Sequence, residues 1–445
     1  MKKYTMALSL FLVGLAVQAQ EVNLSLKEAL NYALEHKAEA LKARLEVENS
    51  RYQIQEVRAM ALPNINVEGG LNNNPILQKS ALPGEIVGQP GTTIMAPFGL
   101  EWGSSLNATV SQILFNQSVF TGLKAAKTTR DFYIINQALT EEQLIEKVAQ
   151  IYYEVYQSQQ MLKTIESNVT STTKIKEIIE SLYTNGLATK IDLDRTKVSL
   201  SNLQASKQQI INAIELQKNS LKFVIGMDLH SDIILPANTF DIDEAVVFTE
   251  NNIENRTEMQ LLKKQEELYT YKKKSILSEH YPTLALFGNF GYYGFGDNFP
   301  WFKEPKDQVF WTSGASVGLT LRIPIFNGLG TRARVKQATI DIQKLQLDIK
   351  DAEQALALDF KNAQTQIENA LITIRIQEEN VALAKDVLEN IQNNYKNGIA
   401  PLTDLLNAET AFTEAENNYT SALLDYKLAE VALIKSQGEL KSLLK

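Results

Sequence analysis

The chain of 445 residues contains no cysteine and only three histidines. Disulfides and thiolate ligands are therefore excluded, and His36, His230 and His280 lie too far apart along the sequence to suggest a shared metal or catalytic site. The zinc-protease motif HExxH and the phosphate-binding loop with its lysine are also absent. We expect no catalytic residues, no metal and no cofactor, and we expect that the protein is not an enzyme.

A block of basic residues is missing as well, and the formal net charge is −8. Nucleic acid is therefore an unsuitable partner. One apolar run stands out, at the N-terminus, where Lys2 and Lys3 precede about 12 apolar residues and the small-residue site Val17-Gln18-Ala19, too short a run for a membrane helix. We interpret residues 1–19 as a signal peptide that is cleaved near Gln20, with no cysteine to accept a lipid anchor. Any further contact with a membrane would have to use strands.

Long stretches also lack glycine and proline, the residues that most often end helices. Neither residue occurs within 123–185, 187–225, 331–397 or 402–437. We expect long helices over 122–186 and 330–398, each followed by a shorter return helix over 186–226 and 398–438. At 1.5 Å per residue the first helix could approach about 95 Å, which indicates a coiled-coil rod.

The two helical hairpins belong to an internal repeat. Tyr183-Thr184-Asn185-Gly186 recurs as Tyr395-Lys396-Asn397-Gly398, an offset of 212 that also relates Asp192 to Asp404. Such self-similarity across half a chain indicates duplication of a structural unit. We divide the chain into a first repeat over 20–226, a linker over 227–251 and a second repeat over 252–445.

Each repeat also contains a helical segment and two strands. Helices are predicted over 24–62, with a break near His36 and a capping box of Ser25 and Glu28, and from about Ile253 to the stop at Pro282. Alternating apolar residues predict strands over 65–71, 106–115, 283–293 and 316–326, the first two forming an antiparallel hairpin. The proline-rich and glycine-rich residues 72–103 are expected to form a long loop.

The linker is acidic and contains Pro236, and we expect neither a helix nor a strand there. Its carboxylates could be taken for a calcium site, but the spacing of an EF-hand loop is absent, which favours a solvated connector. On the return helices, apolar positions alternate at three and four residues, the pattern of close helix packing. These positions are Leu405, Ala408, Phe412, Ala415, Tyr419, Ala422, Tyr426, Ala429 and Leu433.

Aromatic residues gather beside the ends of the strands. In an exported protein whose strands have one polar face, such a cluster favours an interfacial membrane girdle over the alternative of a small core beneath the loops. The predicted girdle consists of Trp102, Trp301, Trp311, Tyr292 and Tyr293.

The order and spacing of these features resemble the TolC-like outer-membrane efflux protein family over nearly the whole mature chain. The resemblance rests on the internal repeat, the strand pairs flanking long helices, the Tyr-x-x-Gly tips and the stretch Leu321-Arg322-Ile323-Pro324-Ile325-Phe326-Asn327-Gly328 that enters a helix. It implies a mainly α fold with a small β part. Long antiparallel helical hairpins would form a periplasmic α-barrel, and four strands per chain would contribute to a twelve-stranded trimeric outer-membrane β-barrel.

The resemblance also implies a function, that of the passive outer-membrane exit channel of a tripartite efflux or type I secretion system in a Gram-negative bacterium. Its partners would be a periplasmic adaptor (membrane fusion) protein, an inner-membrane RND or ABC transporter, and outer-membrane lipid. Four strands alone cannot close a barrel, so the homotrimer would remove the unpaired edges. The alternative is an exported coiled-coil scaffold or adhesin without a channel.

Two groups of site residues follow. By the resemblance, Tyr395, Asp192 and Asp404 hold the periplasmic aperture closed. The next position of the aperture is Asn407 instead of an acid, and Ala400 and Pro401 occupy the segment where the family has a locking arginine. Exposed glycine turns at the end of a rod also predict adaptor docking at Asn185, Gly186, Leu187, Asn397, Gly398 and Ile399.

Overall fold

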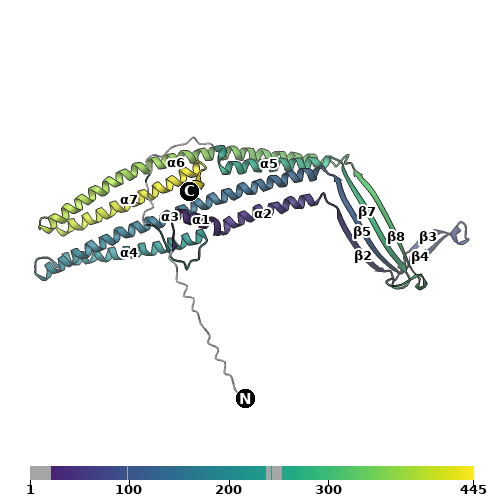
Figure 1. Ribbon diagram of the computed structural model, residues 1–445, viewed down its shortest axis with the longest axis horizontal. Helices are drawn as coiled ribbons and strands as arrows, with labels where there is room; N and C mark the ends of the chain where they lie inside the picture. Colours follow the sequence, from purple (N-terminus) through teal and green to yellow (C-terminus); the bar gives the residue numbers. More distant parts are fainter. Residues whose placement is uncertain (1–21, 98, 237–241, 243–252, 445) are drawn as a thin grey trace, which may run out of the picture. The chain divides into compact units, whose positions relative to one another are not determined.

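The computed structural model describes residues 22–97, 99–236, 242 and 253–444. The predicted signal peptide lies outside the described residues, as do the linker carboxylates Asp241, Asp243 and Glu244. Figure 1 shows long helices that meet in pairs at two tips and lead to a sheet. The helices are α1 (Leu26–His36), α2 (Ala38–Ala59), α3 (Gln117–Thr184), α4 (Lys190–Ile225), α5 (Thr257–Leu277), α6 (Gly330–Lys396) and α7 (Leu402–Ser436).

The chain forms two compact units, each drawing segments from both repeats. The helical unit comprises residues 1–47, 133–263 and 348–445, and it contains both tips. The sheet unit comprises residues 48–132 and 264–347. No helix in the described ranges combines the length and the apolar character that a membrane crossing demands.

The sequence predicted the helices closely. The break near His36 is present between α1 and α2, and Ser25 and Glu28 form the expected capping box. The return helix α4 ends at Gly226, which adopts a left-handed conformation (φ +78°). One boundary was wrong. The helix predicted to start at Gly122 is α3, which begins at Gln117 and continues through Gly122, because a single glycine does not break a long helix.

A four-stranded antiparallel sheet has the order β2–β5–β7–β8. The predicted hairpin of the first two strands is confirmed by the pairing of β2 with β5. The last strand was predicted too late in the chain, because β8 begins at Val309, followed by Phe310 and Trp311, and ends before Pro324, which has no N–H for a ladder. The strands are β2 (Asn64–Asn73), β5 (Trp102–Phe115), β7 (Thr283–Gly296) and β8 (Val309–Arg322).

Two segments contain strands where none was expected. Residues 72–103 are not a loop throughout, because β3 (Lys79–Pro83) and β4 (Thr93–Pro97) pair as an antiparallel ribbon. Both prolines occupy the final position of their strand, at the margin of the ladder, where a missing N–H is tolerated. The linker contains β6 (Ile233–Ile234), which pairs in parallel with β1 (Val22–Asn23).

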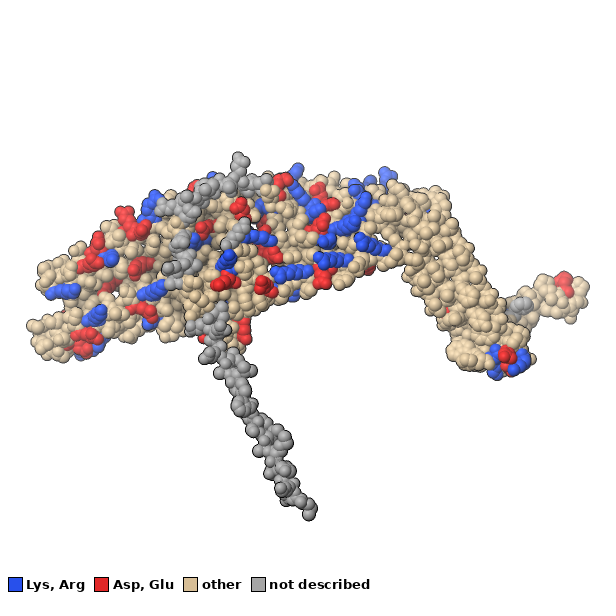
Figure 2. All heavy atoms as spheres, in the orientation of Figure 1, with Lys and Arg blue, Asp and Glu red and all other residues tan. Residues whose placement is uncertain are grey.

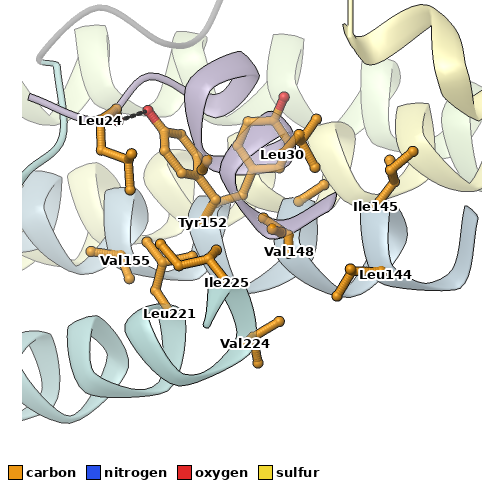
Figure 3. Close-up of a cluster of buried hydrophobic side chains, with 14 of the residues drawn as sticks. Leu24, Leu30, Leu144, Ile145, Val148, Tyr152, Val155, Leu221, Val224 and Ile225 are labelled. Atoms are coloured by element: carbon orange, nitrogen blue, oxygen red, sulfur yellow. Dashed lines mark hydrogen bonds between the residues drawn. The ribbon is translucent and has the colours of Figure 1, made fainter. Parts of the chain in front are cut away.

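The largest core of the helical unit surrounds Tyr152 of α3. Figure 3 shows apolar side chains of α1, α3 and α4 converging on this ring, and the Tyr152 hydroxyl donates a hydrogen bond of 3.0 Å to the carbonyl oxygen of Leu24. Because the phenol has this partner, the aromatic ring is buried without an unsatisfied polar atom. The predicted heptad positions of α7 also face inward, and none of the nine is exposed.

Candidate functional site

The two helical tips have the same backbone geometry. At the first tip Gly186 donates its N–H to the carbonyl oxygen of Tyr183 (3.0 Å), and Leu187 donates its N–H to the carbonyl oxygen of Leu182 (2.8 Å). At the second tip Gly398 and Ile399 bond to Tyr395 and Asn394 at the same distances. This is a Schellman motif, which requires a left-handed residue at the position of the glycine.

Both glycines meet that requirement, with φ of +74° for Gly186 and +70° for Gly398. A Cβ atom added to either would meet nothing within 4 Å in this chain. The following residues project outward, since Leu187 is 77% exposed and Ile399 is 73% exposed. Each tip therefore presents one apolar side chain beside a bare backbone turn, a surface suited to a protein partner.

The return helices begin differently. Thr189 and Asp192 form a capping box on α4, in which the Thr189 hydroxyl donates to the Asp192 carboxylate at 2.6 Å and the Asp192 amide donates back to that hydroxyl at 3.1 Å. At the equivalent position α7 has Pro401, which provides no side-chain cap. Asp404 therefore lies in the first turn of α7 with its side chain exposed, and so does Asn407 in the next turn.

A groove of about 1250 Å³ lies between the two hairpins behind the tips. Its apolar floor includes Ile175, Ile179, Leu402 and Leu405, which pack together with Leu193 in one hydrophobic cluster. Among the predicted site residues, Asp192, Tyr395, Leu187 and Gly398 line this groove.

Tyr395 is half-buried, and its surroundings alter its ionisation. Burial raises the pKa of the Tyr395 phenol above its ordinary value, and the negative charge of Asp192 raises it further. The two side chains are thus brought near one another, but within the described chain the Asp192 carboxylate accepts from Thr189 and no hydrogen bond joins it to Tyr395.

A buried carboxylate that the sequence did not reveal lies deeper between the hairpins. Glu409 of α7 is 8% exposed and accepts hydrogen bonds from the hydroxyls of Ser171 (2.8 Å) and Thr172 (3.2 Å) on α3. Burial raises the pKa of Glu409, and the two hydroxyls partly oppose that shift. The signal available in the sequence was the hydroxyl-rich run 170–173 on α3, which has meaning only once α3 and α7 are known to be neighbours.

The register of the sheet places apolar residues on one face. Residues directly opposite each other share a face, and the rows Ile65, Val110, Gly288, Val317 and Val67, Ala108, Phe290, Ala315 run across all four strands. Ile65, Val67 and Val317 are among the exposed large apolar residues. The opposite face carries Asn66, Asn107, Thr109 and similar side chains, so the sheet has an exposed apolar face and a polar face.

The aromatic residues predicted as a girdle divide between these faces. Tyr292 stacks on Trp311 with 4.9 Å between ring centroids, and both line a groove of about 460 Å³ with Trp301. Trp301 donates from Nε1 to the Ser104 hydroxyl at 3.0 Å.

The other two predicted girdle residues lie apart from that groove. Trp102 packs edge-on against Phe299, 5.4 Å away. Tyr293 is on the polar face, where its hydroxyl donates to the side chain of Asn107 at 2.7 Å. Tyr292 and Trp311 therefore lie on the apolar face of the sheet, whereas Tyr293 lies on the polar face.

Residues 314–318 read Gly-Ala-Ser-Val-Gly and fit the spacing GxSxG of a serine nucleophile. That motif requires a tight turn from a strand into a helix. Here β8 continues straight through the segment and pairs with β7 on both sides of Ser316. The segment is part of the sheet ladder, and its glycines belong to the strand.

Comparisons of the sequence and of the structure with known proteins relate this chain to outer-membrane proteins. A family described as outer membrane efflux protein matches residues 29–227 and 250–439. Outer membrane protein TolC of Vibrio cholerae serotype O1 is 22% identical over 425 residues, covering 94% of this chain and 91% of the relative. Alkaline protease secretion protein AprF of Pseudomonas aeruginosa is 21% identical over 65% of this chain and 60% of its own length. The crystal structure of CusC, a transmembrane channel by its description, superposes with a TM-score of 0.75 at 17% identity and covers 94% of this chain and 93% of that one.

Proposed function

The chain belongs to the outer membrane efflux protein family, and we propose that three copies form an outer-membrane exit channel that passively conducts substrates out of the periplasm. The family is one of outer-membrane channels, and a channel of this kind needs no catalytic residues of its own. In this proposal the sheet lies in the outer membrane and the helical hairpins lie in the periplasm.

The sheet carries this proposal. Its apolar face is exposed, and its edge strands β2 and β8 have a ladder partner on one side only among the described strands. An unpaired edge in lipid leaves N–H and C=O groups without hydrogen bonds, at a cost of several kcal/mol each. Pairing β2 of one copy with β8 of the next removes every edge, and three copies supply enough strands for a barrel.

The distribution of charge supports the same arrangement. Figure 2 shows the sheet almost free of charged side chains on the visible face, whereas Lys, Arg, Asp and Glu are frequent on the helices and reappear at the far end of the sheet. An uncharged band bounded by charged ends suits the hydrocarbon layer of a membrane.

The helical tips would dock a periplasmic adaptor that connects the channel to an inner-membrane RND or ABC transporter. The two matched turns, with exposed Leu187 and Ile399, provide the contact surface. One relative is named as a secretion protein and another is TolC, so the proposal covers both efflux and type I secretion.

The aperture of the closed channel would be formed by Asp404, repeated by the threefold axis, with Tyr395 and Asp192 beside it. Three carboxylates around a narrow opening attract cations and repel anions. The alternative of an exported scaffold or adhesin has no comparable support from relatives that cover most of the chain.

Reconstitution tests the channel directly. Purified protein inserted in a planar bilayer should give single-channel currents and should migrate as a trimer in detergent. A soluble monomer with full helical content and no conductance would overturn the proposal.

A further inference from the structure

The contact between residues 157–172 of α3 and 409–421 of α7 is polar, and we call it the α3–α7 seam. Gln157 donates to the Ser421 hydroxyl (3.1 Å), and Asn168 donates to the Thr413 hydroxyl (2.6 Å). Nearer the tips, Glu409 accepts from two hydroxyls of α3. Both partners of each bond belong to one chain, so the seam exists whatever surface a neighbouring copy covers.

Apolar clusters flank the seam on both sides. Towards the tips, Ile179 of α3 packs in one cluster with Leu405 of α7, and in the other direction Tyr152 of α3 and Leu424 of α7 belong to the largest core. Apolar side chains in between would hold the helices at least as well, because replacing both partners of a buried polar contact by apolar groups is often neutral or stabilising. The polar interruption therefore points to a role other than holding α3 and α7 together.

Glu409 is the more buried of two carboxylates in the seam. It is 8% exposed, and its two oxygens accept from the hydroxyls of Ser171 (2.8 Å) and Thr172 (3.2 Å). Among the described residues, no charged side chain of α3 or α6 contributes to its pKa, which burial raises and the two hydroxyls partly restore. An ionised Glu409 is thus a buried charge without a cation beside it, which is costly.

The second carboxylate, Glu416, stands one heptad further along α7. It is half-buried and lines a groove of about 340 Å³ formed by α3, α6 and α7. Burial raises the pKa of Glu416, while a hydrogen bond from Thr164 of α3 and the positive charge of Lys385 of α6 oppose that shift. The other titratable side chains around this groove are Lys163, Tyr419 and Glu378.

The seam begins close to the proposed aperture. Glu409 lies about 7.5 Å further along α7 than Asp404. A movement of α7 relative to α3 that displaces Asp404 therefore strains the bonds that Glu409 accepts from Ser171 and Thr172.

Resting on the proposed function, we propose that the α3–α7 seam is a proton-responsive switch, in which Glu409 and Glu416 hold α7 against α3 in the closed channel when protonated and release it when ionised. A protonated carboxyl donates its O–H to one hydroxyl and accepts from another, so the closed contact stays hydrogen-bonded. An ionised carboxylate gains from hydration, which favours separation of the two helices. Low pH therefore favours the closed channel, and this preference is lost as the pH rises.

Bilayer recordings of the trimer between about pH 4 and pH 8 test the switch. Each unit by which a pKa in the closed state exceeds that in the open state changes the open-to-closed ratio about tenfold over this range. The open probability of the wild type should rise at least about threefold, the effect of half a unit. Glu409→Gln with Glu416→Gln should remove most of this rise and keep the channel closed. The control is Glu414→Gln, an exposed glutamate between them on α7, which should retain the rise.

A second variant shifts the response instead of removing it. Ser171→Ala with Thr172→Val deletes the two hydroxyls that favour the ionised form of Glu409, so the open probability should rise at a higher pH than in the wild type. A merely structural seam would lose stability without this shift. Asp404→Asn should keep the pH response, because the aperture carboxylate is not part of the switch.

Crosslinking tests whether the two helices separate. The chain has no cysteine, so Asn168→Cys with Thr413→Cys places one pair of thiols across the seam, at side chains that lie 2.6 Å apart. Joined by a short bifunctional thiol reagent, this variant should stay closed at pH 8, whereas the unlinked variant should open. A linked channel that opens as readily as the unlinked one would overturn the switch.

The recordings also separate this inference from the proposed function. An open probability that is independent of pH in the wild type, or equally dependent on pH in the double glutamine variant, would remove the switch and leave the exit channel standing. Absence of current at every pH would count against the channel itself.

Discussion

The two helical tips are alike where the chain turns and different where it resumes. Both end their long helix in the same Schellman motif, with the same hydrogen-bond distances around Gly186 and Gly398. At the start of α4, Asp192 forms a capping box with Thr189. At the start of α7, Pro401 stands where α4 has the threonine, so the side chain of Asp404 has no capping partner.

We propose that this difference gives separate roles to two aspartates that the repeat makes equivalent. A carboxylate that caps its own helix is held in one orientation and contributes to stability. A carboxylate in the first turn without a capping partner still interacts favourably with the helix dipole. Its side chain can also face an opening or a partner protein. The comparison favours Asp404 as the residue that charges the aperture, and Asp192 as a capping residue whose carboxylate is also the proposed acceptor for Tyr395.

The largest expected effect comes from breaking what the tips share. Gly186→Trp or Gly398→Trp should reduce recovery of a crosslinked periplasmic partner, and dye efflux from cells, by more than about tenfold, because the side chain fills space that a partner would occupy. Trimers should persist, since the left-handed backbone costs about 1–2 kcal/mol.

The matched control is Gly88→Trp, at a glycine with φ of +79° and no atom within 4 Å of an added Cβ. It imposes the same backbone strain at the β3–β4 ribbon, away from the tips. An equal loss of efflux in Gly88→Trp would attribute the effect to strain and remove the docking role of the tips.

The next effect should separate the two aspartates. Asp404→Ala should raise single-channel conductance and lower cation preference, because it removes three charges from the aperture, and it should leave thermal stability nearly unchanged. Asp192→Ala should lower stability by about 0.3–1.5 kcal/mol, because it removes the N3 half of the capping box. It should leave the conductance and cation preference of the open channel nearly unchanged, and any rise in open probability would report the contact with Tyr395.

Reversal potentials in a salt gradient and thermal unfolding measure the two quantities on the same preparations. If both substitutions altered conductance alike, the distinction drawn from the capping box would be wrong. If neither did, both aspartates would serve only their helix termini.

The parts of this fold that the sequence predicted are those set by local rules. The absence of glycine and proline defined the long helices, and the repeated Tyr-x-x-Gly defined their ends, because a left-handed turn excludes most other residues. The capping box of Asp192 was within reach of the same rules, since Thr189 stands three residues before it.

The parts that were missed depend on partners distant in sequence. The β3–β4 ribbon was predicted to be a loop because of its prolines. Proline is excluded only from the interior of a ladder, however, and the strand register is needed to see that Pro83 and Pro97 lie at the ends of their strands. Burial of Glu409 depends on α3 lying against α7, and the division of the aromatic residues between two faces depends on strand register.

A smaller effect is expected from Tyr395, whose counterpart Tyr183 is exposed while Tyr395 packs at the edge of the core beneath the tips. If its hydroxyl donates to Asp192 of a neighbouring copy in the closed channel, the contact contributes about 1.5–3 kcal/mol. Tyr395→Phe should then raise the open probability, and more so combined with Asp404→Ala. Tyr183→Phe is the control, and an equal effect of both would argue against a lock.

The smallest effect should appear at Glu409, which in the repeat corresponds to the exposed Lys197. Burial raises the pKa of Glu409 in the folded chain, so the folded state holds this proton more tightly than the unfolded state. The resulting stabilisation is fully present below the unfolded pKa of about 4.3 and is lost as the pH rises through the higher folded value.

Each unit of separation between the two pKa values is worth about 1.4 kcal/mol. Glu409→Gln keeps an oxygen acceptor for the hydroxyls of Ser171 and Thr172 but cannot ionise, so it should abolish this part of the pH dependence and leave the variant more stable than the wild type near neutral pH. Lys197→Gln, on the exposed side of the equivalent helix, should leave the profile unchanged. Thermal unfolding of trimers between about pH 4 and pH 8 measures the difference, and parallel profiles for the wild type and Glu409→Gln would show that the buried carboxylate does not couple protonation to the packing of α3 against α7.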